Sequence, residues 1–385
     1  MRSPKPTRLI SALIATVLVL YPLASHAAAS QRPGTPGIEA SPKEQIAPFQ
    51  PRFGRLRPVI AVIGENSGTE MTDFVIPYSI LTEAAAGEVL ALSVKPGTVT
   101  MRPTSLQLVP QATVAQFDVN YPDGADYVIV PAVAVQSEPL LLAWISAQAA
   151  KGATLVSICD GALVLARAGL MKGKRGTAHW YTHQMREQQY PETSWHKNTR
   201  YVADGRIVSS AGISAALPTS LALVEAIAGR ERALAIGARY GISEWGSQHN
   251  SDRFVPAFGR NLTGHITTKY ANRWLHSAET VGVPVHSGIE DISLALTMDS
   301  YSRTGRSRAL AMAPDKLPFM TRNGLTFLPD RVAGGVNPPQ RILKPLEQAP
   351  VAGLFERVLG NIDADYGRNT GDGVAYDFEY RRVEN

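Results

Sequence analysis

A single cysteine, Cys159, stands where a short apolar stretch gives way to a helical pattern. Residues 154–158 are typical of a buried strand, and apolar residues recur at helical spacing over residues 162–170. A sharp turn from strand to helix would present the thiol at the helix start, where free N–H groups and the helix dipole favour the thiolate. The pattern therefore predicts a nucleophile with a lowered pKa. The alternative is a structural cysteine that only fills core volume.

A thiolate at this position needs a base or a cationic neighbour. His179 is the best-placed histidine, because residues 175–178 are typical of a short strand that would return the chain to the same edge of the sheet. No two histidines have a metal-ligand spacing such as HExxH, so we expect neither a metal nor a cofactor.

Three carboxylates follow the strand-like residues 59–64 and could reach the same edge. Asp73 is our first choice for proton transfer, with Glu70 and Glu65 as secondary candidates. Each could instead be an exposed carboxylate that complements the dipole of the following helix. Asp160, directly after the cysteine, also has two interpretations. It could stabilise the helix start, yet its charge would raise the pKa of the thiol.

These residues are positioned by an alternation of strands and helices. Continuous apolar runs separated by helical segments indicate a parallel sheet that helices cover on both faces. The ligand site of such a fold lies at the carboxyl ends of the strands, where the cysteine stands. Asp204-Gly205 predicts a hairpin between residues 200–203 and 206–209. We expect further strands at 59–64, 89–94, 106–110, 127–131 and 154–158, and helices at 71–85, 139–150 and 215–228.

Beyond residue 250 the sequence contains short segments that match the first half of the fold, which indicates either a partial duplication or a chance match of apolar residues. Residues 72–81, 95–96 and 106–115 have counterparts at 290–299, 313–314 and 325–333, at an offset of 218 and then 219 residues. We interpret this as a partial duplication with a structural role, because it has no second cysteine turn. We therefore divide the remaining chain into a domain at 59–250 and a C-terminal region at 251–385.

The beginning of the chain has the layout of a signal peptide. Three basic residues precede an apolar stretch at 9–23, which at about 15 residues is shorter than a membrane-spanning helix. We expect a signal peptide at 1–27 with cleavage near Ala27, and a periplasmic or secreted protein. Contact with a membrane would require this segment to stay uncleaved. Residues 28–58, rich in Pro and Gly, are predicted to be a linker or a wrapping arm.

The composition is that of a globular protein. Hydrophobic residues make up 44% and charged residues 18% of the 385 residues. The net charge of +5 comes from scattered basic residues, so we expect no nucleic-acid partner. One cysteine allows no disulfide within the chain.

The order of the motifs resembles one family. The chain carries, in sequence, Cys-Asp-Gly-Ala, Ala-Gly-Leu, Gly-Lys-Arg, Thr-Ala-His-Trp, Asp-Gly-Arg-Ile and Ser-Ala-Gly-Ile-Ser. This series, over residues 59–232, is similar to that of the DJ-1/PfpI superfamily, whose class I glutamine amidotransferase-like domains occur in isonitrile hydratases and GlxA/AraC-type regulators. The resemblance implies a flavodoxin-like α/β three-layer sandwich, a Cys159 nucleophile with His179 nearby, and a homodimer. Asp73 begins Asp-Phe-Val-Ile-Pro-Tyr, which matches the Asp, Pro and Tyr of the isonitrile hydratase pattern.

Three features depart from the family pattern. Relatives have Pro-Gly-Gly after the buried strand, where this chain has Pro-Ala-Val, so the backbone N–H of Val133 would form the oxyanion hole together with that of Asp160. Relatives with hydratase activity have a threonine in place of Asp160. AraC-type relatives append a basic helix-turn-helix pair, which we do not find in residues 251–385.

We therefore expect a cysteine-dependent hydratase or hydrolase-like enzyme that acts on a small molecule with an electrophilic carbon. Cys159 would attack, while Asp73 and His179 would move protons. One alternative is a non-catalytic small-molecule or redox sensor, which Val133 and Asp160 favour. Another is a GlxA/AraC-type transcriptional regulator-like protein without a helix-turn-helix.

Overall fold

The computed structural model describes residues 44–346 and 351–382. The predicted signal peptide at 1–27, its cleavage site and the first part of the predicted linker lie outside these residues. No helix in the described ranges has the length and apolar character needed to cross a membrane.

A seven-stranded sheet in the order β11-β12-β8-β7-β1-β3-β6 forms the centre of the first domain. Every neighbouring pair is parallel except the β11–β12 hairpin. The strands are β1 (Val59–Gly64), β3 (Glu88–Ser93), β6 (Ala112–Thr113), β7 (Tyr127–Val130), β8 (Thr154–Ser157), β11 (Tyr201–Asp204) and β12 (Ile207–Ser210).

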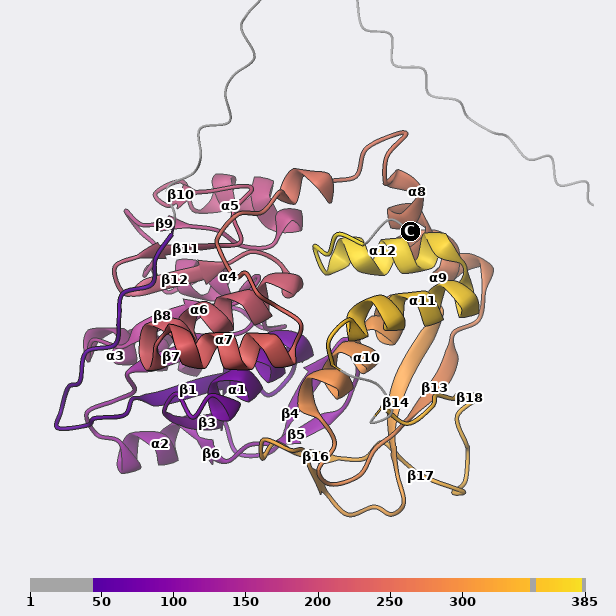
Figure 1. Cartoon of the computed structure of the whole chain (residues 1–385), viewed down its shortest axis with the longest axis horizontal. Coiled ribbons are helices and arrows are strands. Elements are labelled where there is room, and N and C mark those ends of the chain that lie inside the picture. Colours follow the sequence, from indigo (N-terminus) through magenta and orange to yellow (C-terminus); the bar gives the residue numbers. More distant parts are fainter. Residues whose placement is uncertain (1–43, 347–350, 383–385) are drawn as a thin grey trace, which may run out of the picture. The chain divides into compact units, whose positions relative to one another are not determined.

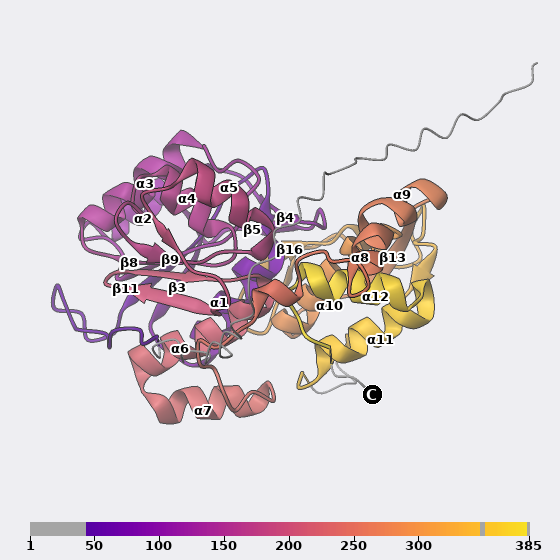
Figure 2. The same ribbon diagram turned by 90° about the horizontal axis from the view of Figure 1, so that it is seen from above.

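Helices cover both faces of this sheet (Figure 2). Along β1, Ile60 and Val62 belong to one apolar core and Ala61 and Ile63 to another, because successive side chains of a strand point to opposite faces. The chain therefore has the predicted flavodoxin-like α/β sandwich. The first core includes α1 (Met71–Glu83), α6 (Ala216–Ala228) and α7 (Arg230–Arg239); the second includes α2 (Val114–Asn120), α3 (Pro139–Ala150) and α4 (Gly161–Arg167).

Two local predictions differ from the structure. The hairpin turns at Gly205-Arg206, not at Asp204-Gly205, since Asp204 pairs with Ile207 and Gly205 has a φ of 64°. β9 (Arg175–Gly176) is shorter than the predicted strand at 175–178. It pairs with β10 (Ser194–Trp195) in a separate two-stranded sheet, and α5 (His183–Gln189) lies between these two strands in the chain.

The described part of the predicted linker lies against the domain. Glu44 pairs with Arg175, and Arg52 donates to the buried Asp126 at 2.8 Å. The backbone N–H of Phe49 donates to the Ala226 carbonyl. Residues 44–58 thus contact the domain as a wrapping arm would.

The C-terminal region contains a four-stranded parallel sheet in the order β17-β14-β13-β18. A separate five-stranded sheet, β15-β16-β5-β4-β2, joins strands of the two regions (Figure 1). The strands are β2 (Thr69–Glu70), β4 (Val99–Arg102), β5 (Gln107–Val109), β13 (Glu279–Pro284), β14 (Ser307–Ala313), β15 (Phe319–Met320), β16 (Thr326–Leu328), β17 (Arg331–Val332) and β18 (Arg341–Ile342); the helices are α8 (Leu262–Ile266), α9 (Asn272–Leu275), α10 (Asp291–Arg303), α11 (Leu354–Tyr366) and α12 (Arg368–Asp377).

The sequence comparison places the second copy's helix two residues away from its position in the structure. Glu70 and Glu290 are the N-cap residues of α1 and α10, so the helix starts correspond at an offset of 220 (290 − 70) and not 218. The later strands correspond at 219, as expected from the sequence, since β5 begins at Gln107 and β16 at Thr326. Short apolar matches misplaced the helix because its apolar residues recur at several similar spacings.

Candidate functional site

Cys159 lies on a strained turn between β8 and α4. Its φ of 54° is in the left-handed region that residues with a side chain seldom adopt, and such strain persists where the surrounding structure enforces it. Its backbone N–H donates to the hydroxyl of Ser210 at 3.3 Å. Gly161 allows the turn to pack, because a Cβ there would lie 1.9 Å from the Val130 carbonyl oxygen. The Cys-Asp-Gly motif thus has a steric cause.

The cysteine faces a cavity of about 600 Å³. The first domain and the C-terminal region both contribute to its wall, and charged side chains of both signs are present. Lining residues from the first domain include Glu70, Ala132, Cys159, Asp160, His179 and Trp180; those from the C-terminal region include Leu262, His265, Lys269, Arg273, Arg303 and Asp377. This size and mixed lining suit a small molecule.

The thiol is held in its neutral form. Burial raises the pKa of Cys159 well above its ordinary value, and the nearby Asp73 and Asp160 carboxylates raise it further. A hydrogen bond from the backbone N–H of Asp160 acts in the opposite direction but is outweighed. The prediction of a lowered pKa is therefore wrong. α4 has seven residues, and the dipole of so short a helix does not offset burial next to acids.

Asp73 is fully buried in the first turn of α1. Its Oδ2 accepts a hydrogen bond from the Ala132 N–H at 3.1 Å, whereas its Oδ1 is buried without a hydrogen-bond partner. Burial raises the pKa of Asp73 to about 8, and the N–H of Ala132 only partly opposes this. A carboxyl group that is protonated near neutral pH can donate a proton, as the sequence assignment to proton transfer requires.

Glu70 lines the cavity and pairs with Arg303 of α10. Burial raises the pKa of Glu70 despite this arginine, which acts to lower it. Glu65 lies elsewhere, where its carboxylate accepts hydrogen bonds from the N–H and hydroxyl of Ser67 within a turn. The structure thus places Glu70 at the cavity and gives Glu65 a local role in its own turn.

Both ring nitrogens of His179 are engaged with the backbone. Nδ1 accepts from the Tyr181 N–H at 3.3 Å, and Nε2 lies 3.0 Å from the Asp377 carbonyl oxygen, to which it can only donate. These two contacts fit the tautomer that carries its proton on Nε2. His179 therefore lines the cavity without a free nitrogen for the thiol proton.

A buried polar cluster lies behind Asp160. Its carboxylate accepts from the Thr182 hydroxyl at 2.7 Å, and the Arg186 guanidinium donates to that hydroxyl and to the His179 carbonyl. Arg186 is 1% exposed and also stacks over the Trp195 ring. These hydrogen bonds restrict the rotation of the Asp160 side chain.

The two predicted oxyanion donors differ in placement. The N–H of Asp160 points at the thiol, as its effect on the pKa of Cys159 shows. Val133 faces Thr69 across an isolated antiparallel bridge, and it is Ala132, not Val133, that lines the cavity. The N–H of Ala132 is already used by Asp73.

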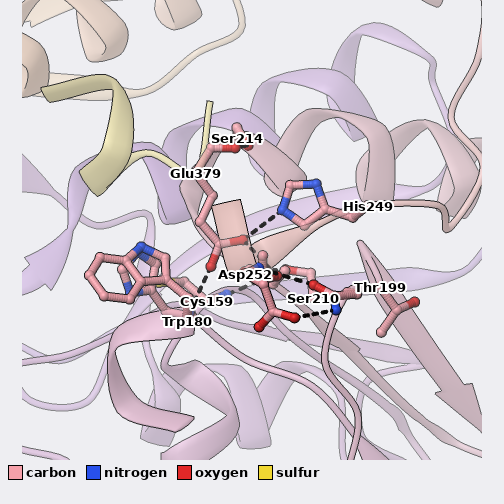
Figure 3. A network of polar contacts seen from close by, with 12 residues as sticks. Cys159, Trp180, Thr199, Ser210, Ser214, His249, Asp252 and Glu379 are labelled. Carbon is pink, nitrogen blue, oxygen red and sulfur yellow. Dashed lines mark hydrogen bonds and ion pairs between the residues drawn. The ribbon is translucent and has the colours of Figure 1, made fainter. Parts of the chain in front are cut away.

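Glu379, from far along the chain, supports the site through the residues next to it and does not line the cavity itself (Figure 3). Its carboxylate accepts from the Trp180 N–H at 2.7 Å and lies 2.8 Å from Nε2 of His249. A third contact comes from the Ser251 hydroxyl at 3.4 Å. Glu379 itself is 1% exposed, so this buried carboxylate fixes the segment that carries His179 and Trp180.

Residues 59–226 match the family model described as the DJ-1/PfpI family. The chain carries a DJ-1/PfpI domain. Isonitrile hydratase of Pseudomonas putida is 33% identical over 135 residues, which are 34% of this chain and 55% of the hydratase. The HTH-type transcriptional regulator CdhR of Pseudomonas aeruginosa is 31% identical over 102 residues, 26% of this chain and 30% of the regulator. The chain therefore spans about half or less of the length of these relatives.

Two solved structures are similar to about half of the chain. Drosophila melanogaster DJ-1beta is 22% identical, with a TM-score of 0.44, over 49% of this chain and 100% of that structure. An AraC family transcriptional regulator of Pseudomonas putida is 20% identical, with a TM-score of 0.41, over 47% of this chain and 98% of that structure.

Three site residues around the DJ-1/PfpI domain escaped the sequence analysis. Arg303 and Glu379 lie outside residues 59–226, and Arg186 lies in a polar helix with nothing to set it apart. Of these, only Arg303 could have been found from the sequence, because it is the last residue of the helix that the proposed duplication predicts. In the described ranges, no three His, Cys, Asp or Glu side chains are grouped to hold a metal ion.

Proposed function

We propose that the Cys159 cavity binds a small molecule and adds the cysteine thiol to an electrophilic carbon of it. The observation that carries this proposal is the pairing of a strained, cavity-facing cysteine with a buried carboxyl group, Asp73, that has one unpartnered oxygen. Strained backbone at a cavity is a common property of reactive residues. The similarity to an isonitrile hydratase supports the same class of chemistry.

The chemistry starts from a neutral thiol and a neutral acid. With an isonitrile, Asp73 would give its proton to the terminal carbon while the sulfur bonds to that carbon, and the carboxylate would take up the thiol proton. The product is an S-linked thioimidate. Water then adds to its carbon and expels the thiol, which leaves an N-substituted formamide and the free enzyme. The Asp160 N–H would stabilise negative charge that develops during the second step.

The test uses the protein without its N-terminal 27 residues and a panel of small isonitriles, aldehydes and amides. Turnover should vanish in Cys159→Ala and fall by about 100-fold or more in Asp73→Asn. Asp291→Asn is the matched control, because Asp291 is also a buried carboxyl at a helix start whose pKa burial raises. Full turnover by Cys159→Ala would refute the proposal.

A second candidate function is a non-catalytic sensor of a small molecule. The engaged ring of His179 and the raised pKa of Cys159 favour it, since neither group is prepared for base catalysis. Binding of a ligand to Cys159→Ala with unchanged affinity, together with no turnover by the unmodified protein, would favour the sensor over the enzyme.

Export is also proposed, on the strength of the signal-peptide layout at 1–27. Fractionation of cells that express the full chain should place it, shortened near Ala27, outside the cytoplasm. An intact chain in the cytoplasm would support the regulator-like alternative instead.

A further inference from the structure

The C-terminal region reproduces the order of the first domain's opening elements. In both, a strand is followed by a helix and by a second, parallel strand: β1, α1 and β3 in one and β13, α10 and β14 in the other. A short third strand then pairs in parallel with the second, β6 with β3 and β17 with β14.

The correspondence extends to individual hydrogen bonds. Before β6, Gln111 accepts from the Ala91 N–H through its side chain and donates to the Ala91 carbonyl through its backbone. Before β17, Asp330 makes the same two bonds with Ala311, at 2.8 Å and 2.9 Å. Agreement at this level indicates that the two segments are copies of one unit.

The copies pack on each other through equivalent surfaces. β5 and β16 correspond at an offset of 219 and pair antiparallel, with Leu108 opposite Phe327. On either side, Gln107 pairs with Leu328 and Val109 with Thr326. Leu108 thus faces its own counterpart, whereas Gln107 faces the counterpart of Val109 and Val109 faces that of Gln107. This is the arrangement about a two-fold axis. The equivalent helices α1 and α10 also pack on each other, and the Thr72 hydroxyl donates to Asp299 at 2.8 Å.

Two-fold packing of equivalent surfaces is how two identical subunits form a dimer. Here the second copy belongs to the same chain. We propose that residues 279–332 replace a second subunit: they cover the face of the DJ-1/PfpI domain formed by α1 and β5, and they complete the Cys159 cavity in cis with Arg303. A second chain cannot pack on this face while residues 279–332 cover it, so we expect the protein to act as a single chain.

Arg303 is the residue through which the second copy reaches the site. It pairs with Asp299 one turn earlier at 2.6 Å and with Glu70 across the interface, and it lies over the Phe378 ring. The corresponding position of α1 is Glu83 (303 − 220), which instead pairs with Arg239. The two copies have therefore diverged at this position. The copy whose helix reaches the Cys159 cavity has an arginine, and the copy in the first domain has a glutamate. We assign Arg303 as a positioning residue that holds Glu70 at the cavity, a role that rests on the proposed function.

The cis pairing can be tested with a designed disulfide. Gln107→Cys and Leu328→Cys would be combined in a Cys159→Ala background, so that the two new thiols are the only ones in the chain. Oxidation should give a cross-linked species with the mass of one chain on a non-reducing gel, and each single variant should stay unlinked. A linked species of two chains would overturn the proposal, and the absence of any link in the folded variant would refute the β5–β16 pairing itself. Val109→Cys with Thr326→Cys serves if the first pair does not fold.

The size of the protein in solution provides a second test. Light scattering on the unmodified protein should give the mass of one chain over a wide range of concentrations. A dimer that persists on dilution would overturn the proposal.

The role of Arg303 is measured by the pH dependence of Cys159 alkylation with iodoacetamide, which needs no known substrate. Arg303→Met leaves Glu70 without its paired cation, and Glu70 acts to raise the pKa of Cys159, so the variant should slow alkylation at pH 8 by roughly three- to tenfold. Arg303→Lys should restore part of the rate. Arg308→Met, which removes an exposed arginine of β14 that donates to Ser105, is the matched control. An unchanged pH profile in Arg303→Met would refute the positioning role even if the cis pairing holds.

Discussion

Replacement of Glu379 tests how the C-terminal region supports the site. Glu379→Ala removes a fully buried carboxylate side chain from beside His249, whose own side chain is 11% exposed, and takes away the acceptor of the Trp180 N–H. The carboxylate is the shared acceptor of the Trp180 N–H and the His249 ring, and each buried donor left without an acceptor costs about 1–3 kcal/mol. We therefore expect the free energy of unfolding to fall by about 2–5 kcal/mol in total.

Glu379→Gln is the matched variant, since its amide oxygen can still accept from the Trp180 N–H. The expected loss is about 1–2 kcal/mol, because the hydrogen bonds then go to a neutral amide oxygen in place of a charged carboxylate. Urea unfolding followed by tryptophan fluorescence measures both variants. A loss below about 1 kcal/mol in Glu379→Ala would refute the reasoning, because no buried pair would then have been broken.

The pH dependence of this effect has a defined sign. Burial alone would raise the pKa of Glu379, but the hydrogen bond from His249 and the N–H of Trp180 lower it below its ordinary value of 4.5. A carboxyl group whose pKa is lowered by folding stabilises the protein above its ordinary pKa, and this stability is lost as the pH falls through the lowered value. The difference between the unmodified protein and Glu379→Gln should therefore be full at pH 7 and shrink in acid.

Three further predictions concern the cysteine turn and its neighbours. Gly161→Ala should lower the free energy of unfolding by about 3 kcal/mol or more, measured by urea unfolding, because its Cβ would overlap the Val130 carbonyl; a stable variant would contradict the turn geometry. Folding raises the pKa of Asp73 to about 8, so its contribution favours folding in acid and is lost as the pH rises to that value. Asp73→Asn should thus gain stability relative to the unmodified protein between pH 5 and pH 8 in the same assay, and a constant difference would count against the raised pKa. His179→Gln should keep the rate of Cys159 alkylation within about twofold, because Gln can still donate to the Asp377 carbonyl, whereas a large loss of rate would identify His179 as the base.

The sequence predicted the elements of the first domain because each depends on local patterns. The strand at 59–64 and the helix at 139–150 have the predicted bounds, since a continuous apolar run and a proline at a helix start are strong local signals. The cysteine turn could also be predicted from the sequence, because Cys-Asp-Gly interrupts the apolar run at the point where β8 ends.

The pKa of the Cys159 thiol and the hydrogen bonds of His179 could not be predicted in the same way. The local argument from the helix dipole considered Cys159 and its own helix, whereas the pKa of the thiol depends on burial and on Asp73, which lies 86 residues earlier (159 − 73). His179 was found as a cavity residue, but the carbonyl that occupies its Nε2 belongs to Asp377. No pattern within a short window of sequence reports such pairings.

The contacts that complete the cavity also set the order in which it can form during synthesis. The acceptor of the Trp180 N–H lies 199 residues later in the chain, and the arginine that pairs with Glu70 lies 233 residues later. When the whole DJ-1/PfpI domain has been synthesised, the cysteine is present, but Arg303 of the cavity wall and Glu379, which holds the Trp180 segment, are not. The thiol cannot acquire its finished surroundings until nearly all of the described chain has been made, so an incomplete or C-terminally clipped product would carry Cys159 in an unfinished pocket.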